Sequence, residues 1–151
     1  ATLIVNGPVK AMKQILLPLE GLSDAEAAIR FLQLKPFHEA VELTLLTVLT
    51  STEPPWPGDA AGAAAATEKL EEQANFIDGV AERLRAIGYQ AHGVAVTGVP
   101  STMILQQAAT LRSDLILMGT RGRKGITRFV LGSTSHAVLH KTTCPVLAFH
   151  H

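Results

Sequence analysis

The sequence is poor in cysteine and aromatic residues, and it lacks long apolar runs. Its one cysteine, Cys144, excludes an internal disulfide and fits a reducing compartment. Five Phe, one Trp and one Tyr leave the core to Leu, Ile, Val and Ala. No apolar run approaches the roughly 20 residues that cross a bilayer. Residues 1–12 also lack the basic start and apolar core of a signal peptide. We therefore expect a cytoplasmic protein.

Acidic residues are absent from the last quarter of the chain. All thirteen lie at or before Asp114, whereas residues 115–151 carry five bases. Residues 1–114 carry eight bases and thirteen acids, a net charge of −5, and residues 115–151 carry a net charge of +5. The whole chain is therefore neutral. Two interpretations fit this asymmetry: an anionic partner for the C-terminal part, or a solvated basic face.

The chain has the length and composition of one globular domain, with 151 residues, 47% hydrophobic and 17% charged. Helical periodicity predicts helices, and apolar runs predict strands. Strands are predicted over 14–19, 41–49, 90–96, 115–118 and 145–149, and helices over 23–35, 67–87, 100–111 and 133–140. This alternation predicts an α/β domain at 12–151 with a parallel sheet covered by helices on both faces, after a leader at 1–11.

Three local features carry further predictions. Ser23 followed by Glu26 has the spacing of a capping box, so a helix is expected to begin there. Residues 50–66 contain three prolines and two glycines and predict a long loop. Trp56, inside this loop, could be a ligand lid or a partner contact. Packing on the domain's own surface is the favoured interpretation.

The segment at residues 118–134 (MGTRGRKGITRFVLGST) carries the chemistry. It follows a predicted strand and enters a predicted helix. Its glycines allow close approach of the backbone to a ligand, and its end is a helix N-terminus, which favours phosphate. Four bases add positive charge: Arg121, Arg123, Lys124 and Arg128. Together these features favour an anion site over a simple turn.

Other motifs are absent or are interpreted as structural. The segment contains neither G-x4-G-K-[ST] nor G-x-G-x-x-G, so it is neither a P-loop nor a Rossmann fingerprint. His136 and His140 lie four residues apart on a predicted helix and could ligate a metal. They are interpreted instead as surface residues. We assign no catalytic residue, and Cys144 is expected to be buried and inert. Few aromatics accompany the basic cluster, so a nucleic-acid partner is not expected.

The glycine spacing G-x2-G-x9-G-S resembles the ATP-binding signature of the universal stress protein family. Similarity extends over about residues 12–149, including KQILLPLE at 13–20, SDLILMG at 113–119 and CPVLA at 144–148. The resemblance implies a five-stranded parallel sheet of order 3-2-1-4-5, a Rossmann-like fold of the adenine nucleotide alpha hydrolase type. The crevice between its first and fourth strands would bind the ligand.

The family's site residues map onto this chain position by position. Pro18, Leu19 and Glu20 would border the adenosine, and Val48 would pack on the adenine. The resemblance places the rest along the ribose and the phosphates: Met118, Gly119, Arg121, Gly122, Arg123, Gly132, Ser133 and Thr134. Two positions depart from the family pattern, because Glu20 stands where Asp is usual and Arg121 stands where many relatives carry His.

The implied ligand is ATP, or AMP or ADP, with any Mg²⁺ carried mainly by the phosphates. The expected function is an ATP-binding regulatory protein of the stress response, a dimeric nucleotide-dependent switch. Two alternatives stay open: a slow ATPase or an enzyme transferring phosphate or adenylate, and an interaction module that regulates a transporter.

A homodimer through the last strand is also predicted. The order 3-2-1-4-5 would make this strand a sheet edge, and its residues from Val146 to Phe149 are apolar and uncharged. Such an edge pairs readily with a second copy. The alternative is that the leader folds back over the edge, for which Leu3, Ile4 and Val5 are suited.

Overall fold

The computed structural model describes residues 2–4, 11–50, 56–120 and 132–150. Strands and helices alternate along these residues after a short first strand. In chain order the elements are β1 (Thr2–Ile4), β2 (Gln14–Pro18), α1 (Leu22–Gln33), β3 (Glu42–Leu49), α2 (Ala60–Ala86), β4 (Gln90–Thr97), α3 (Pro100–Thr110), β5 (Leu115–Thr120), α4 (Ser133–Lys141) and β6 (Val146–His150). The five predicted strands are present as β2 to β6, and the four predicted helices as α1 to α4.

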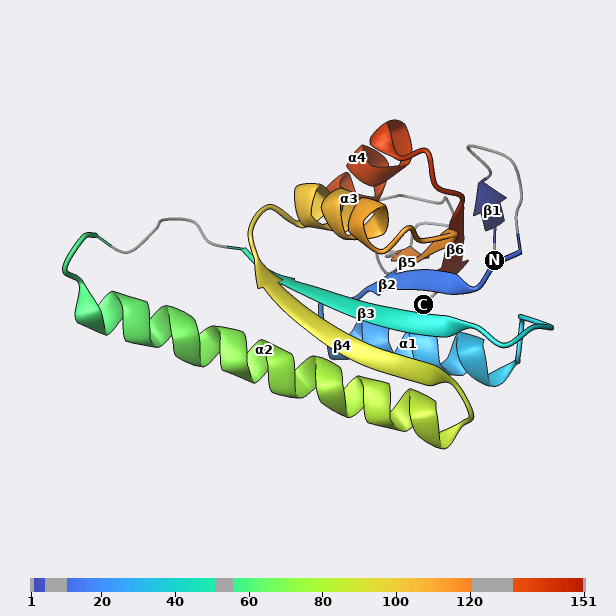
Figure 1. Cartoon of the computed structure of the whole chain (residues 1–151), viewed down its shortest axis with the longest axis horizontal. Helices are drawn as coiled ribbons and strands as arrows, with labels where there is room; N and C mark the ends of the chain where they lie inside the picture. Colours follow the sequence, from blue (N-terminus) through green and yellow to red (C-terminus); the bar gives the residue numbers. More distant parts are fainter. Residues whose placement is uncertain (1, 5–10, 51–55, 121–131, 151) are drawn as a thin grey trace, which may run out of the picture.

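The sheet has the strand order β1-β6-β5-β2-β3-β4 (Figure 1). Strand β2 runs parallel to β3 on one side and to β5 on the other, and β4 and β6 extend the parallel sheet outward. These five strands therefore have the predicted order 3-2-1-4-5, with the second strand of the chain at the centre.

Apolar side chains on both faces of the sheet explain the layered architecture. Ile15 and Leu17 of β2 pack with α1 and α2, whereas Leu16 between them packs with α3 and α4. Successive side chains of a strand point to opposite faces, so an unbroken apolar run buries both. Helices α1 and α2 cover one face, and α3 and α4 cover the other. No described helix is long and apolar enough to cross a membrane.

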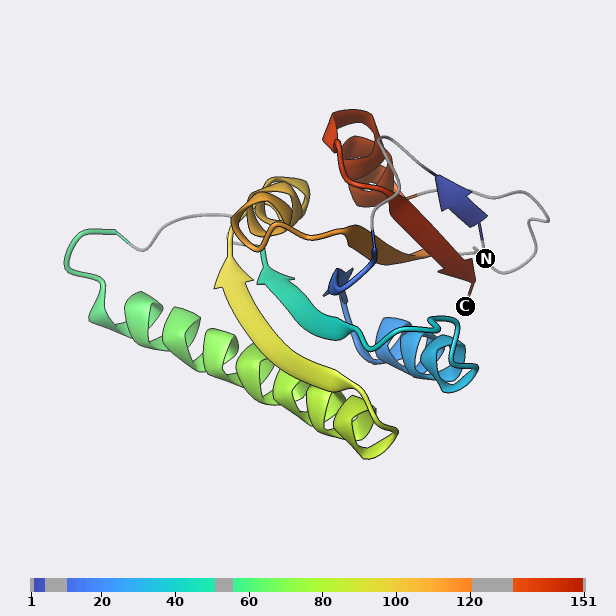
Figure 2. The ribbon, with the colours of Figure 1, turned by 45° about the vertical axis from the view of Figure 1, so that its right-hand side comes forward.

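Strand β6 is not an edge of the sheet, which corrects the sequence-based prediction. Strand β1 pairs with it antiparallel, in the register Thr2↔Ala148, Leu3↔Leu147 and Ile4↔Val146. Figure 2 shows the two strands side by side and running in opposite directions. An apolar, uncharged edge gains hydrogen bonds from any extended segment that reaches it. Here part of the predicted leader supplies that segment, which confirms the alternative that the leader folds back over the edge.

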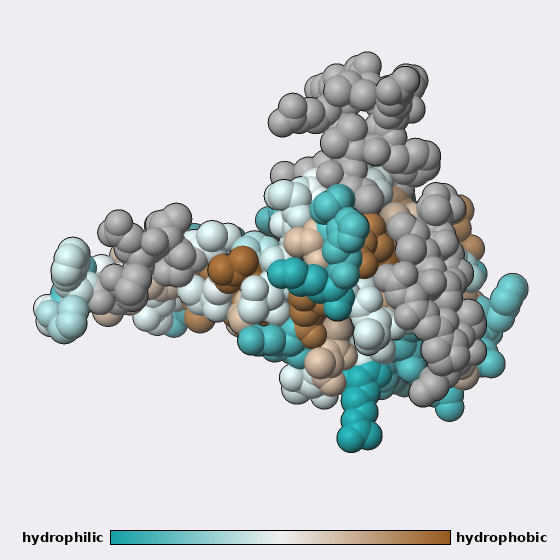
Figure 3. Space-filling view, turned by 90° about the horizontal axis from the view of Figure 1, so that it is seen from above, coloured by the Kyte–Doolittle hydropathy of each residue, from teal (hydrophilic) through white to brown (hydrophobic). Residues whose placement is uncertain are grey.

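Helix α2 begins earlier than predicted. Residues 60–66 are helical rather than part of a loop, because alanine has the highest helix propensity and Asp59 caps the helix. The Asp59 carboxylate accepts a hydrogen bond from the Gly62 N–H at 2.9 Å. The amino-terminal end of α2 projects from the body of the molecule at the left of Figure 1, and the same projection is at the left of Figure 3. Trp56, just before it, is 77% exposed, so the expectation that it packs on the domain's surface is wrong.

The capping box predicted at Ser23 is also wrong. Helix α1 already begins at Leu22, and its N-cap Gly21 makes no side-chain capping hydrogen bond. The carboxylate of Asp24 instead accepts a hydrogen bond from the backbone N–H of Glu20, with 3.0 Å between Oδ2 and N. The turn between β2 and α1 is therefore held by an aspartate inside the first helical turn.

Candidate functional site

A pocket of about 420 Å³ opens beyond the carboxyl ends of β2, β3 and β5. Strand β2 pairs with β3 at five positions but with β5 at only two, Ile15↔Leu115 and Leu16↔Ile116. The two central strands therefore separate before Pro18, which has no N–H to donate to a ladder. At this point the chain connections also leave in opposite directions, the arrangement that forms a ligand crevice in open α/β sheets.

The floor of the pocket is apolar and its rim is polar. The floor is formed by Leu46 of β3, Ile104 of α3 and Met118 of β5, and each is at most 7% exposed. Such a floor can cover a flat aromatic base, while polar groups at the rim orient it. The complete described lining consists of Pro18, Leu19, Glu20, Asp24, Leu46, Val48, Thr50, Pro100, Ile104, Met118, Gly119, Thr134 and Ser135.

Seven of the twelve residues assigned from the family resemblance line this one pocket. They come from four separate segments of the chain and are Pro18, Leu19, Glu20, Val48, Met118, Gly119 and Thr134. Gly132 and Ser133 lie next to Thr134 at the start of α4 and do not line the pocket. Arg121, Gly122 and Arg123 lie outside the described residues.

Helix α4 brings its amino-terminal end to the pocket. Gly132 is its N-cap, in an extended conformation with φ −62° and ψ 163°, and makes no side-chain capping bond. The N–H groups of a first helical turn have no partner within the helix, and the helix dipole makes this end positive. No described protein atom lies within 4 Å of the place that a Cβ would take on Gly132. Packing within the described protein therefore does not require glycine at this position.

Asp24 lines the pocket, although it is not among the site residues assigned from the sequence. It is 9% exposed and binds the Glu20 N–H through its carboxylate. Asp24 follows Glu20 by four residues, a spacing visible in the sequence, where Ser23 and not Asp24 is the predicted capping residue. Two carboxylates and no Lys or Arg thus line the described part of the pocket.

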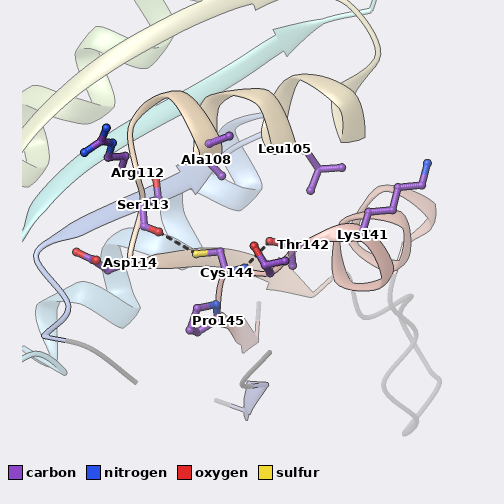
Figure 4. Close-up of a pocket in the computed structure, with 11 residues that line it drawn as sticks. Leu105, Ala108, Arg112, Ser113, Asp114, Lys141, Thr142, Cys144 and Pro145 are labelled. Atoms are coloured by element: carbon purple, nitrogen blue, oxygen red, sulfur yellow. Dashed lines mark hydrogen bonds between the residues drawn. The ribbon is translucent and has the colours of Figure 1, made fainter. Parts of the chain in front are cut away.

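A second cleft, of about 510 Å³, lies at the opposite end of β5 and β6 (Figure 4). Its lining includes Cys144, whose Sγ donates to the Ser113 carbonyl oxygen at 3.2 Å. The carboxylate of Asp114 is held by the backbone N–H groups of Lys13 and Gln14, at 3.0 and 2.9 Å. The cleft adjoins the carboxyl ends of α3 and α4, where the helix dipole disfavours anions.

Cys144 is half-buried rather than fully buried. Burial, aided by the negative charge of Asp114, raises the pKa of its thiol to about 11. A thiol with this pKa stays protonated at neutral pH and is a poor nucleophile. This agrees with the expectation that Cys144 is inert. The smaller pocket at the strand carboxyl ends, and not this cleft, is therefore the candidate functional site.

The chain is similar to known proteins over nearly its whole length. A universal stress protein of Methanocaldococcus jannaschii, MJ0531, is 29% identical over 146 residues, which cover 95% of this chain and 85% of the relative. The solved structure of MJ0577, a universal stress protein from the same organism, superposes with a TM-score of 0.78 at 25% identity. That alignment covers 94% of this chain and 98% of MJ0577.

A universal stress protein of Archaeoglobus fulgidus, solved in complex with dAMP, shares the fold with a TM-score of 0.57. It is 19% identical, and the alignment covers 93% of this chain and 99% of that protein. The model of the universal stress protein family matches residues 12–150, which include all five parallel strands and the pocket. The chain therefore belongs to the universal stress protein family.

Proposed function

We propose that the chain is a regulatory protein of the stress response that binds ATP in the pocket beyond β2, β3 and β5. One observation carries the proposal: four segments that the sequence resemblance assigned to an ATP site contribute side chains to a single pocket. The Archaeoglobus relative that holds dAMP supports an adenine nucleotide as the class of ligand. The single cysteine is consistent with action in the reducing cytoplasm.

The chemistry of the lining suggests how the nucleotide is held. Val48 and Met118 offer apolar surface to the adenine, and the Glu20 carboxylate accepts hydrogen bonds from adenosine hydroxyl or amino groups. The α4 N-terminus, with Ser133 and Thr134, donates to phosphate oxygens. Arg121, through its guanidinium, adds a charged donor to the same phosphates in this proposal.

Mg²⁺ fits this site through its oxygen ligands. In this proposal the Glu20 carboxylate faces the adenosine and the Asp24 carboxylate holds the Glu20 N–H, so phosphate oxygens and water would supply most of the Mg²⁺ ligands. Carboxylates and phosphates are the donor set that Mg²⁺ prefers, so the residues present are compatible with a Mg–ATP complex. AMP and ADP are the alternative occupants, and a ligand lacking the terminal phosphates would not require the metal.

Regulation is favoured over catalysis because both carboxylates of the described lining have other roles in this proposal, Glu20 toward the adenosine and Asp24 toward the Glu20 N–H. No histidine, lysine or cysteine lines the described part of the pocket. A hydrolase needs a base that activates water, and a transferase needs a bound second substrate. Slow hydrolysis, or transfer of phosphate or adenylate, remains the alternative. Steady turnover well above background with a defined second substrate would favour it.

The dimer that belongs to this proposal requires a rearrangement. Strand β1 occupies the β6 edge in the described structure, and a second copy would use the same backbone groups of Val146–His150. Pairing through β6 is thus possible only after β1 separates. An interaction module that regulates a transporter would use the same edge, again after β1 separates.

Two measurements test the proposal. Mass spectrometry of nucleotide released by denaturing the purified protein should identify an adenine nucleotide. Calorimetric titration should then show that Glu20→Ala weakens ATP binding while binding of inorganic triphosphate is unchanged. Glu20→Gln, which keeps an acceptor oxygen, serves as the matched control. A wild-type protein that binds neither ATP nor AMP at millimolar concentration would refute the assignment.

A further inference from the structure

Two histidines of α4 converge on one point outside the pocket. His136 and His140 are four residues apart, so they lie on the same face of the helix, and both are exposed. Their Nε2 atoms are 3.1 Å apart, and their ring centroids are 4.3 Å apart with the planes tilted by 54°. Both rings therefore present the same nitrogen to a common position.

The distance between the two nitrogens matches that between two ligands of one metal ion. Imidazole nitrogens lie about 2.0–2.1 Å from a bound zinc ion, so two of them 3.1 Å apart would subtend an angle of about 100° at the metal. This angle lies between the octahedral and the tetrahedral values. We propose that His136 and His140 form a surface site for a divalent transition metal of the zinc, nickel or copper class.

Without metal, the same geometry is a hydrogen bond in which one Nε2 donates its proton and the other accepts it. Metal binding needs both Nε2 lone pairs. The donating ring meets this need by moving its proton from Nε2 to Nδ1, which frees the second lone pair. Nitrogen ligands select zinc, nickel and copper over Mg²⁺ and Ca²⁺, which take oxygen ligands.

The surroundings make this site open and exchangeable. Among the described residues, no group of three or more His, Cys, Asp or Glu side chains could hold a metal, so water would complete the coordination. His140 lies in the last turn of α4, whose carbonyl end favours a cation, whereas the neighbouring Lys141 opposes one. The site is independent of the nucleotide pocket, whose lining contains neither histidine.

The test is calorimetric titration with Zn²⁺ in a His150→Ala, His151→Ala background, which removes the other adjacent histidine pair. His136→Ala and His140→Ala should each weaken Zn²⁺ binding by at least about tenfold, because each removes one of two ligands. His38→Ala, which removes another exposed histidine, should leave binding unchanged. Mg²⁺ at the same concentration should not compete.

Thermal unfolding gives a second readout, because a metal that joins residues one turn apart stabilises the helix. Zn²⁺ should raise the midpoint temperature of unfolding of the His150→Ala, His151→Ala background protein. It should not raise that temperature when His136→Ala and His140→Ala are added to the same background. Circular dichroism checks that the variants fold, as expected for exposed positions. Equal Zn²⁺ affinity in the background protein and the double variant would overturn the proposal.

Discussion

The carboxylate of Asp24 holds the backbone of Glu20, with Oδ2 accepting the Glu20 N–H at 3.0 Å. Asp24 is buried at the start of α1, whereas Glu20 is exposed at the rim of the pocket. The hydrogen bond thus anchors a rim residue to a helix packed in the core. The position of the Glu20 side chain depends on this anchor, which suggests an indirect role for Asp24 in nucleotide binding.

Asp24→Ala should destabilise the protein and weaken ATP binding together. Loss of a hydrogen bond from a buried carboxylate costs roughly 1–3 kcal/mol in the free energy of unfolding. Asp24→Asn keeps an acceptor oxygen and should recover most of both properties. Urea unfolding and calorimetric titration measure the two effects. If Asp24→Asn were as damaging as Asp24→Ala, the negative charge and not the hydrogen bond would be responsible.

Gly132→Thr should reduce ATP affinity with little effect on stability. Thr and Gly are about equally good N-caps, and a Cβ at this position meets no described protein atom within 4 Å. The change in unfolding free energy should therefore stay within about 0.5 kcal/mol. The added side chain would obstruct phosphate at the α4 N-terminus, so ATP and triphosphate binding should fall and adenosine binding should not. A variant with normal triphosphate affinity would place the phosphates elsewhere.

Ser133→Ala tests one donor at the same helix end. Removal of a single hydroxyl hydrogen bond should cost roughly 0.5–2 kcal/mol, a few-fold to about thirtyfold in ATP affinity. Ser133 is exposed at the start of α4, so the fold should not depend on its hydroxyl. Calorimetric titration with ATP measures the effect, and unchanged affinity would exclude a phosphate contact from Ser133.

Cys144 should react slowly with iodoacetamide until the pH approaches its raised pKa of about 11. At pH 8 the thiolate fraction is at least about a hundredfold below that of a thiol with an ordinary pKa of about 8.5. Folding favours the protonated thiol, so its contribution to stability is complete below the ordinary pKa and is lost as the pH rises through about 11. Alkylation of Cys144 in denaturing urea is the control. If the folded protein reacted as fast as the unfolded protein, the raised pKa of the Cys144 thiol would be contradicted.

Deletion of residues 1–5 should convert monomer into dimer. The full chain covers the β6 edge with β1, so sedimentation velocity at micromolar concentration should show a monomer. The shortened chain exposes an apolar, uncharged edge that can pair with a second copy. Leu147→Lys, at a half-buried position of β6, should restore a folded monomer. A shortened chain that stays monomeric would show that this edge does not self-associate.

The sequence by itself determined the alternation of elements and the glycine-rich segment after β5. Runs such as residues 15–19 are apolar at every position, and this local pattern predicts strands buried on both faces. The family resemblance then assigned Glu20, Val48 and Thr134 to one site, and the structure brings them to one pocket. Helix boundaries were less accurate at α1 and α2, where Asp24 and Asp59 make the decisive local hydrogen bonds.

Tertiary structure decided the contacts between residues far apart in the chain. Thr2 pairs with Ala148 across almost the whole sequence, and three such pairs remove the edge that the strand order predicted. Asp114 likewise binds the backbone of Lys13. The sequence left the first contact open as the alternative to a dimer and did not reveal the second. Such contacts depend on which distant segment reaches an open edge or an unsatisfied group once the sheet has formed.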